Sequence, residues 1–297
     1  RSITLNVDCE VWNVPSVECT PKQRFEVAYD TTVFNYFYKD RHAVDIALSE
    51  MLSDALLESH FAIVAIQQLA KAQALAKQLV SNSQGKEKEA WHKKQLLLGL
   101  KQIAIKDHYA IFEIADLEEY VELSAQLDRW LVDQPQDNIE LLTYQYKTYR
   151  HLAHLYAGQN QFESALRLFR RANDVQHALA SNHPQQEQYK SALLKSTYHI
   201  GWSLLNLENP DDAVTVFTQA LAMYEQSSHD LKKLLDSRDV ALRTSVSLAF
   251  IHEVKEDINL AQEALGTAEK WLAVFSDDEL TRAQLTHIPP LIEKIRG

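Results

Sequence analysis

The feature that most constrains the fold is a pattern of side chains that recurs twice, each time 48 residues further along the chain. In the first copy, large apolar or aromatic residues mix with small ones at helical spacing: Tyr149, Leu152, Ala153, Tyr156, Ala165, Phe169 and Ala172. The second and third copies are Thr197, Ile200, Gly201, Leu204, Ala213, Phe217 and Ala220, then Ser245, Leu248, Ala249, His252, Ala261, Leu265 and Ala268. A constant period of this length is typical of units that bury their apolar faces against one another. The sequence therefore predicts an array of helical repeats.

Each copy of the pattern fits two helices joined by a tight turn. Residues with turn or cap preference interrupt the helical periodicity at 158–161, 209–212 and 255–257. The small residues let the two helices of a hairpin approach closely, and the aromatic residue fills the gap to the next unit. With only six Gly and seven Pro in 297 residues, the composition also favours helix. We therefore expect an all-α, right-handed superhelical solenoid.

The chain before the clear repeats differs from them. Residues 1–42 begin with an alternation of apolar and polar side chains, which predicts a short strand in a non-repeat N-terminal arm: Ile3, Leu5, Val7, Cys9 and Val11. Residues 43–85 have helical periodicity and read either as one helix of about 35 residues or as two helices hinged near Glu58 to His60. Residues 86–297 are assigned to the repeat array, which starts with a degenerate helix pair and ends with a capping helix over 279–296.

Charge and hydropathy exclude some partners. The formal net charge is −11, so the protein as a whole should repel nucleic acid and anionic membranes. No uninterrupted apolar run approaches 18 residues, which argues against membrane insertion. The segment 43–80 is a candidate surface for homo-oligomerisation.

Cys9 and Cys19 are the only cysteines, and two readings of them stay open. A disulfide between them suits a periplasmic or secreted protein, whereas two reduced thiols suit the cytoplasm. The chain starts Arg1-Ser2 without Met, which fits a cut or processed product, so localisation is left undetermined.

The repeated residues resemble the tetratricopeptide repeat family. The family pattern places an aromatic, Leu, Gly or Ala, and Tyr on the first helix, then Ala, Phe and Ala on the second. Tyr149 to Ala172 matches this pattern well, and the later copies match it with substitutions, such as Thr197 for the aromatic. The 48-residue period exceeds the usual 34, so the chain is similar to elongated bacterial forms found in signalling and transcription regulators.

The resemblance implies that a peptide or protein binds on a concave face lined by the first helix of each unit. The side chains that the register places there are Lys147, Arg150 and His154; Lys195, Tyr198, Trp202 and Asn206; Arg243, Phe250 and Glu253. Basic residues take the equivalent position in all three units, at Lys147, Lys195 and Arg243. This groove suits an acidic or carboxylate-ended peptide. Alternatively, these cations are solvated or pair with carboxylates of the adjacent second helix.

No pattern indicates catalysis or a cofactor. His151 and His154 lie three apart on one helix, but no HExxH or similar motif accompanies them, so we expect no metal site. Paired acids at predicted helix starts, such as Asp211 and Asp212, are explained by the helix dipole.

Two functions remain. The first is a non-catalytic peptide-binding module of a bacterial regulator or scaffold. The second is a sensory domain whose superhelix changes pitch when a small ligand or signal peptide binds.

Overall fold

A computed structural model describes residues 2–7, 23–28, 41–58, 60–109, 111, 114–132 and 139–275. The chain divides into two compact units, residues 1–134 (unit 1) and 135–297 (unit 2). This division lies within the segment 86–297 that was predicted as one array. Each unit is described by itself.

Unit 1 begins with a two-stranded antiparallel sheet, made by β1 (Ser2–Val7) and β2 (Gln23–Ala28). Ile3 pairs with Val27 and Leu5 with Phe25 in this ladder. The alternation at the start of the chain therefore does form a strand, and β2 packs against the first helix of the unit. Cys9 and Cys19 lie outside the described residues.

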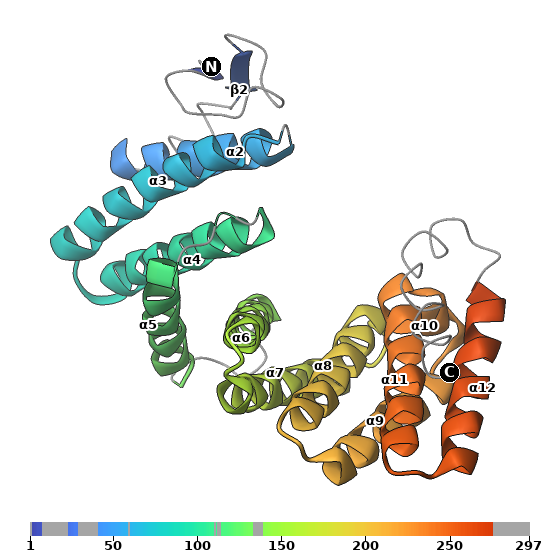
Figure 1. The fold of residues 1–297 in the computed structure, drawn as a ribbon. Coiled ribbons are helices and arrows are strands. Elements are labelled where there is room, and N and C mark those ends of the chain that lie inside the picture. The colour runs from blue at the N-terminus through green and yellow to red at the C-terminus, as the bar shows by residue number, and fades with distance from the viewer. Residues whose placement is uncertain are drawn as a thin grey trace. The chain divides into compact units, whose positions relative to one another are not determined.

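Four helices follow in unit 1 (Figure 1): α2 (Arg41–Glu58), α3 (Ala62–Asn82), α4 (Gly85–His108) and α5 (Ile114–Leu131). Residues 43–80 are thus two helices with a break at residues 59–61, and not one long helix. Each helix packs on the next one along the chain. Much of α3 is buried inside the unit, including Val64, Leu69 and Ala72, so little of its apolar face is left for a second copy of the chain.

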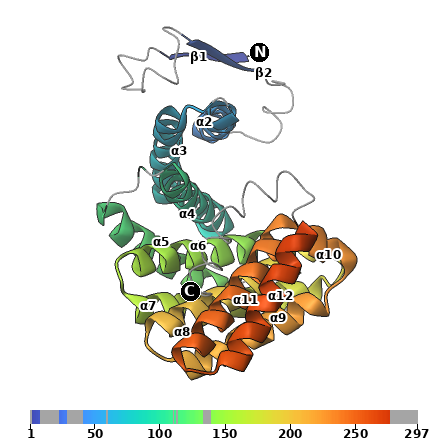
Figure 2. The same cartoon turned by 45° about the vertical axis from the view of Figure 1, so that its right-hand side comes forward.

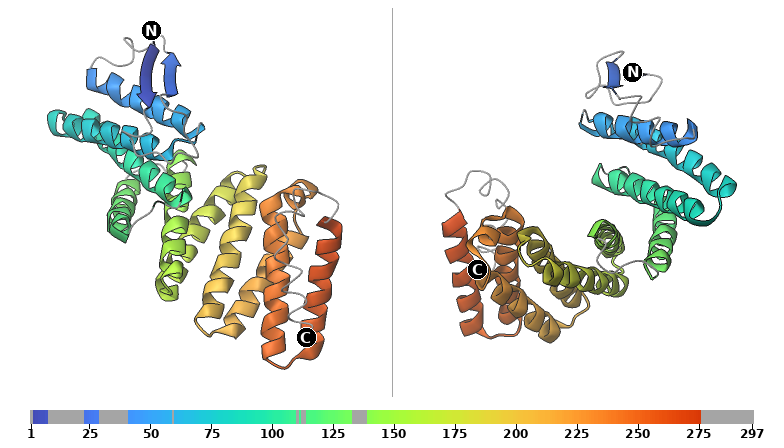
Figure 3. Two further views of the ribbon diagram at one scale, coloured as in Figure 1. Left: turned by 45° about the horizontal axis from the view of Figure 1, so that its top comes forward. Right: turned by 180° about the vertical axis from the view of Figure 1, so that it is seen from behind.

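Unit 2 contains three hairpins in sequence. The helices are α6 (Ile139–Gly158), α7 (Phe162–Asn182), α8 (Glu187–Asn206), α9 (Pro210–Glu225), α10 (His229–Lys233), α11 (Leu235–Val254) and α12 (Ile258–Phe275). Successive helices lie side by side, and α11 packs on both α8 and α9 (Figures 2 and 3). The predicted capping helix at 279–296 lies outside the described residues.

The repeated residues form the core of unit 2. Ala153, Ala165, Phe169, Ala213 and Phe217 have no exposed surface. The small residues are necessary at these contacts, as Gly201 shows: a Cβ atom there would lie 2.7 Å from Cε1 of Phe217. The signature therefore encodes helix packing, as its spacing predicts.

The hairpin turns share one backbone geometry. Each contains a non-glycine residue with positive φ, at Asn160, Glu208 and Glu256, which are 48 residues apart. The next residue donates its N–H to the carbonyl five residues earlier, which closes the end of the first helix. The turn between α2 and α3 has the same form, with His60 at φ 64° and Phe61 N–H donating to the Leu56 carbonyl.

This shared turn identifies a repeat-like hairpin that the sequence pattern missed. The hairpin α2–α3 matches α6–α7 at an offset of 100 residues, and the second helices span 62–82 and 162–182. Ala65, Leu69 and Ala72 are fully buried and correspond to Ala165, Phe169 and Ala172. The repeat-like part of the chain therefore begins at α2, earlier than predicted.

Candidate functional site

The residues predicted to line a binding face lie on α6, α8 and α11, the first helices of the three hairpins in unit 2. Their positions repeat at 48 residues, so Lys147, Lys195 and Arg243 are equivalent. His154, Trp202 and Phe250 form a second equivalent set. In this article these three helix surfaces are called the A face.

His199, which the sequence pattern did not single out, lies at the centre of the best-defined part of the A face. Its ring stacks on Phe169 with centroids 4.9 Å apart and meets the ring of His154 edge-on at 4.6 Å. Its Nε2 atom is buried and has no hydrogen-bond partner among the described residues. A buried polar atom without a partner is costly, and in native proteins it often marks a site where something else binds.

Several basic side chains act on His199. Burial lowers the pKa of His199 well below its ordinary value, and the positive charges of His154, Lys195, Arg150 and Arg243 lower it further. These side chains come from α6, α8 and α11, so three helices direct positive charge at one ring. The sequence register predicted the basic residues but not the ring at their centre.

Two of the cations have partners. Lys195 Nζ lies 3.2 Å from a carboxylate oxygen of Asp236, and Arg243 Nε lies 2.7 Å from one of Asp239. Both carboxylates are on α11, which is a first helix, so the predicted pairing with an adjacent second helix is wrong in its location. The Asp236 side chain is 67% exposed, and such a surface pair contributes about 0–1 kcal/mol. An acidic ligand can therefore displace it at low cost.

The other two cations of the A face are not paired with carboxylates. The Arg150 guanidinium lies over the ring of Tyr146, 5.6 Å from its centroid. Lys147 is exposed and has no ion pair within the described ranges. The A face thus keeps an excess of positive charge in a protein of net charge −11.

The predicted aromatic and amide contacts divide into two groups. Burial raises the pKa of Tyr198, and the charge of Arg243 and a hydrogen bond with Ser247 oppose that rise, so Tyr198 belongs to the cluster around His199. Trp202 instead packs on Phe162 with ring centroids 5.4 Å apart.

Beyond this cluster, the side chain of Asn206 donates to the carbonyl of Trp202 at 2.8 Å, within its own helix. Phe250 is 45% exposed, which is unusual for a phenylalanine in a packed helix. Glu253 is exposed near the end of α11. The structure thus joins Arg150, His154, Lys195, Tyr198 and Arg243 into one cluster and leaves the other predicted residues outside it.

Unit 1 provides an internal comparison for this charge. At the offset of 100 residues, Arg150 and His154 correspond to Glu50 and Asp54 on α2. Glu50 forms an ion pair with Lys94, and Asp54 forms one with Lys101 at 2.6 Å. The same helix surface is therefore charge-compensated in the hairpin α2–α3 and basic in the hairpin α6–α7.

The described residues contain no group of three or more His, Cys, Asp or Glu side chains able to hold a metal ion. His151 and His154 accordingly have no third ligand among them. No helix in the described part of the chain is long and apolar enough to cross a membrane.

The hairpins, their common turn and their small-residue packing define a helical-repeat solenoid, the kind of fold that serves protein–protein interaction. Comparison with known families gives the particular type: residues 147–192 match the family described as the tetratricopeptide repeat. The chain is therefore a protein of the tetratricopeptide repeat family, with a 48-residue period in unit 2. No curated protein sequence matches it.

Solved structures agree on the fold. A Podosopora anserina protein described as a kinesin light chain with nearly identical TPR-like repeats is similar with a TM-score of 0.53 at 16% identity, covering 80% of this chain and 100% of that one. A second structure of the same description has a TM-score of 0.52 at 16% identity, covering 79% and 98%. BtubC (BKLC) from P. vanneervenii has a TM-score of 0.43 at 12% identity, covering 81% and 94%, and is not used further.

Proposed function

We propose that unit 2 is a non-catalytic binding module of a regulator or scaffold, and that its A face holds an acidic or carboxylate-bearing segment of a partner protein. The observation that carries the proposal is the convergence of Arg150, His154, Lys195 and Arg243 on His199, whose buried Nε2 has no partner in the described part of the chain. A carboxylate placed there gains several charge-assisted contacts and meets a nitrogen that can donate a hydrogen bond.

Charge supports an acidic partner over a neutral one. Complementary charges steer association and decide which partner binds, even where each pair adds little affinity. The two carboxylates on this face, Asp236 and Asp239, already engage Lys195 and Arg243 at the strength of surface pairs. An incoming acidic segment replaces these weak contacts and also reaches Lys147 and Arg150.

The test uses fluorescence anisotropy with a labelled acidic peptide library and its amide twin, in which every Glu and Asp is replaced by Gln and Asn. Wild-type protein should prefer the acidic library, and this preference should fall as salt rises from 50 to 300 mM because exposed charges are screened. Replacing Lys195 and Arg243 together by Gln should weaken acidic binding by roughly 5–30-fold, from about 1–2 kcal/mol of lost charge interactions.

A matched control removes the same charge elsewhere in unit 2. Arg167 and Arg170 are exposed on α7, a second helix, and their double replacement by Gln should change binding less than about twofold. Equal binding of the acidic library and its amide twin by wild-type protein would refute the proposal. So would equal losses in the two double variants.

A further inference from the structure

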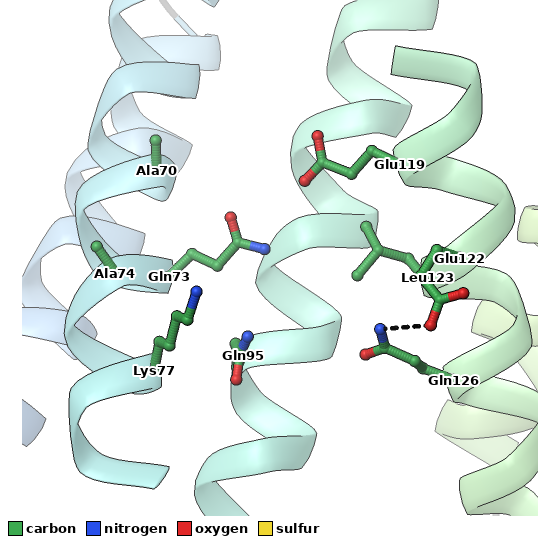
Figure 4. A pocket seen from close by; sticks show the side chains of 9 residues that line it. All are labelled: Ala70, Gln73, Ala74, Lys77, Gln95, Glu119, Glu122, Leu123 and Gln126. Carbon is green, nitrogen blue, oxygen red and sulfur yellow. Dashed lines mark hydrogen bonds between the residues drawn. The ribbon is translucent and has the colours of Figure 1, made fainter. Parts of the chain in front are cut away.

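A pocket of about 420 Å³ opens between α3, α4 and α5 of unit 1 (Figure 4). Its volume lies in the range of small-molecule sites in proteins. Its lining mixes charged and amide side chains with a small apolar surface: Ala70, Gln73, Ala74, Lys77, Gln95, Glu119, Glu122, Leu123 and Gln126. The residues come from three helices, so the pocket depends on the tertiary fold.

The α3 wall offers hydrogen-bond donors. The side-chain amide of Gln102 donates to Oε1 of Gln73 at 2.8 Å, which fixes the orientation of the Gln73 amide. The Nε2 atom of Gln73 is left without an acceptor among the described residues. Lys77 extends from the same helix into the pocket (Figure 4) and has no ion pair within the described ranges. This wall therefore presents an ammonium group beside a pre-oriented amide N–H.

The α5 wall offers acceptors. Glu122 accepts from Gln126 and from Arg129, each at 3.0 Å, and these two contacts hold its pKa below the usual value. Glu119 extends into the pocket (Figure 4) and has no partner in the described part of the chain. It is therefore the carboxylate that remains available to a ligand.

Gly99 of α4 lets the two walls come close above it. A Cβ atom at Gly99 would lie 2.6 Å from Nε2 of Gln73 and 2.9 Å from Cδ1 of Leu123. Only glycine leaves room for this arrangement without moving one of the two side chains. The position of the Gln73 amide is thus set from below by Gly99 and from the side by Gln102, as in a preformed site.

Charges elsewhere on these helices are satisfied, which sets the pocket apart. Lys94, Lys101 and Lys106 each form an ion pair, with Glu50, Asp54 and Asp116. Lys77 and Glu119 face the pocket from opposite helices and pair with nothing among the described residues. A ligand that carries both charges satisfies both walls at once.

We propose that this pocket binds a small zwitterion of the amino acid or short-peptide class. The ligand's carboxylate lies toward Lys77 and the Gln73 amide, and its ammonium group lies toward Glu119. Gln95 and Gln126 supply both donors and acceptors to the amide or polar groups between these ends. The site uses only unit 1 residues, so it does not depend on the function proposed for unit 2.

The test measures binding to the full chain by saturation-transfer NMR, followed by titration calorimetry of any hit. One arm uses the twenty L-amino acids, and a second arm uses pools of di- and tripeptides with free ends. Each hit is measured again with its amine acetylated and with its carboxylate amidated. Either block should weaken binding at least tenfold, because each removes the charge that one wall recognises.

Variants assign the binding to the pocket. Lys77→Met should weaken the unblocked ligand at least fivefold, and Glu119→Gln should abolish its advantage over the acetylated form. The controls Lys71→Met and Glu118→Gln remove the same charges from exposed positions on the same helices outside the pocket and should leave binding unchanged. All four positions are exposed on helix surfaces, so the variants should fold.

The two arms distinguish the source of the ligand. Binding of free amino acids indicates a metabolite site, and binding of peptides alone indicates a chain segment with free ends. Absence of binding in both arms at 10 mM ligand overturns the proposal. Binding that survives both blocks, or that the pocket and control variants affect equally, also overturns it.

Discussion

Gly201 allows a direct test of the packing that builds the array. It lies inside α8, where glycine costs roughly 0.5–1 kcal/mol of helix stability relative to alanine. Gly201→Ala would recover that amount if space were available. However, the added Cβ would lie 2.7, 2.8 and 3.1 Å from three ring carbons of Phe217. That ring has no exposed surface, so it cannot move aside freely.

The magnitude follows from these two opposed effects. Inserting a methyl group into a well-packed core costs about 1–3 kcal/mol. After the gain in helix propensity, Gly201→Ala should lower the free energy of unfolding by about 0.5–2 kcal/mol. For a unit of this size that corresponds to a melting temperature lower by roughly 1–8 °C.

Gly266 supplies the matched control. It lies inside α12, and no heavy atom would lie within 4 Å of an added Cβ there. Gly266→Ala should therefore raise the free energy of unfolding by roughly 0.5–1 kcal/mol. Urea denaturation followed by circular dichroism measures both variants by linear extrapolation. A Gly201→Ala protein as stable as wild type, or one shifted in the same direction as Gly266→Ala, would refute the argument.

Three further changes test other parts of unit 2. Because the folded state holds the pKa of His199 low, the unfolded state binds more protons below about pH 6.5, so stability should fall as the pH drops from 6.5; His199→Gln should flatten this slope in urea midpoints measured from pH 7.5 to 5.0, and an unchanged slope would contradict it. The side chain of Asn209 accepts from the Asp212 N–H at 3.3 Å and caps α9, so Asn209→Ala should cost about 1 kcal/mol while Asn209→Ser costs less. Phe169→Ala, at a fully buried position, should cost about 3–5 kcal/mol and lower the melting temperature accordingly; a loss under 1 kcal/mol would show that the ring is not part of the core.

The sequence was sufficient to predict the hairpins of unit 2 because their packing residues repeat at one offset. It was not sufficient for α2–α3, whose offset of 100 residues is not a multiple of 48. The first helix of that hairpin also carries Ser49 and Ser53 where α6 has Tyr149 and Ala153. The signal that could have revealed the hairpin is on the second helix, where Ala65, Leu69 and Ala72 keep the spacing.

The candidate sites were predictable only in part, for a different reason. Helical register assigns a side chain to a face of its own helix, and this was enough to select Arg150, Lys195 and Arg243. It does not say which ring or carboxylate of a neighbouring helix lies opposite, so His199 and Asp236 could not be placed. The pocket in unit 1 was out of reach of the same reasoning, because its walls come from three helices whose crossing no local pattern specifies.

The two hairpins related by the offset of 100 residues separate the structural from the functional part of the repeat. Their buried columns and their turns agree, so packing is common to both. Their exposed first-helix positions have opposite charge, with Glu50 and Asp54 in one and Arg150 and His154 in the other. Packing alone does not require this inversion, because each set is compatible with the same backbone. The charge on the outer positions is therefore the variable by which one repeated scaffold offers a compensated surface in unit 1 and a basic one in unit 2.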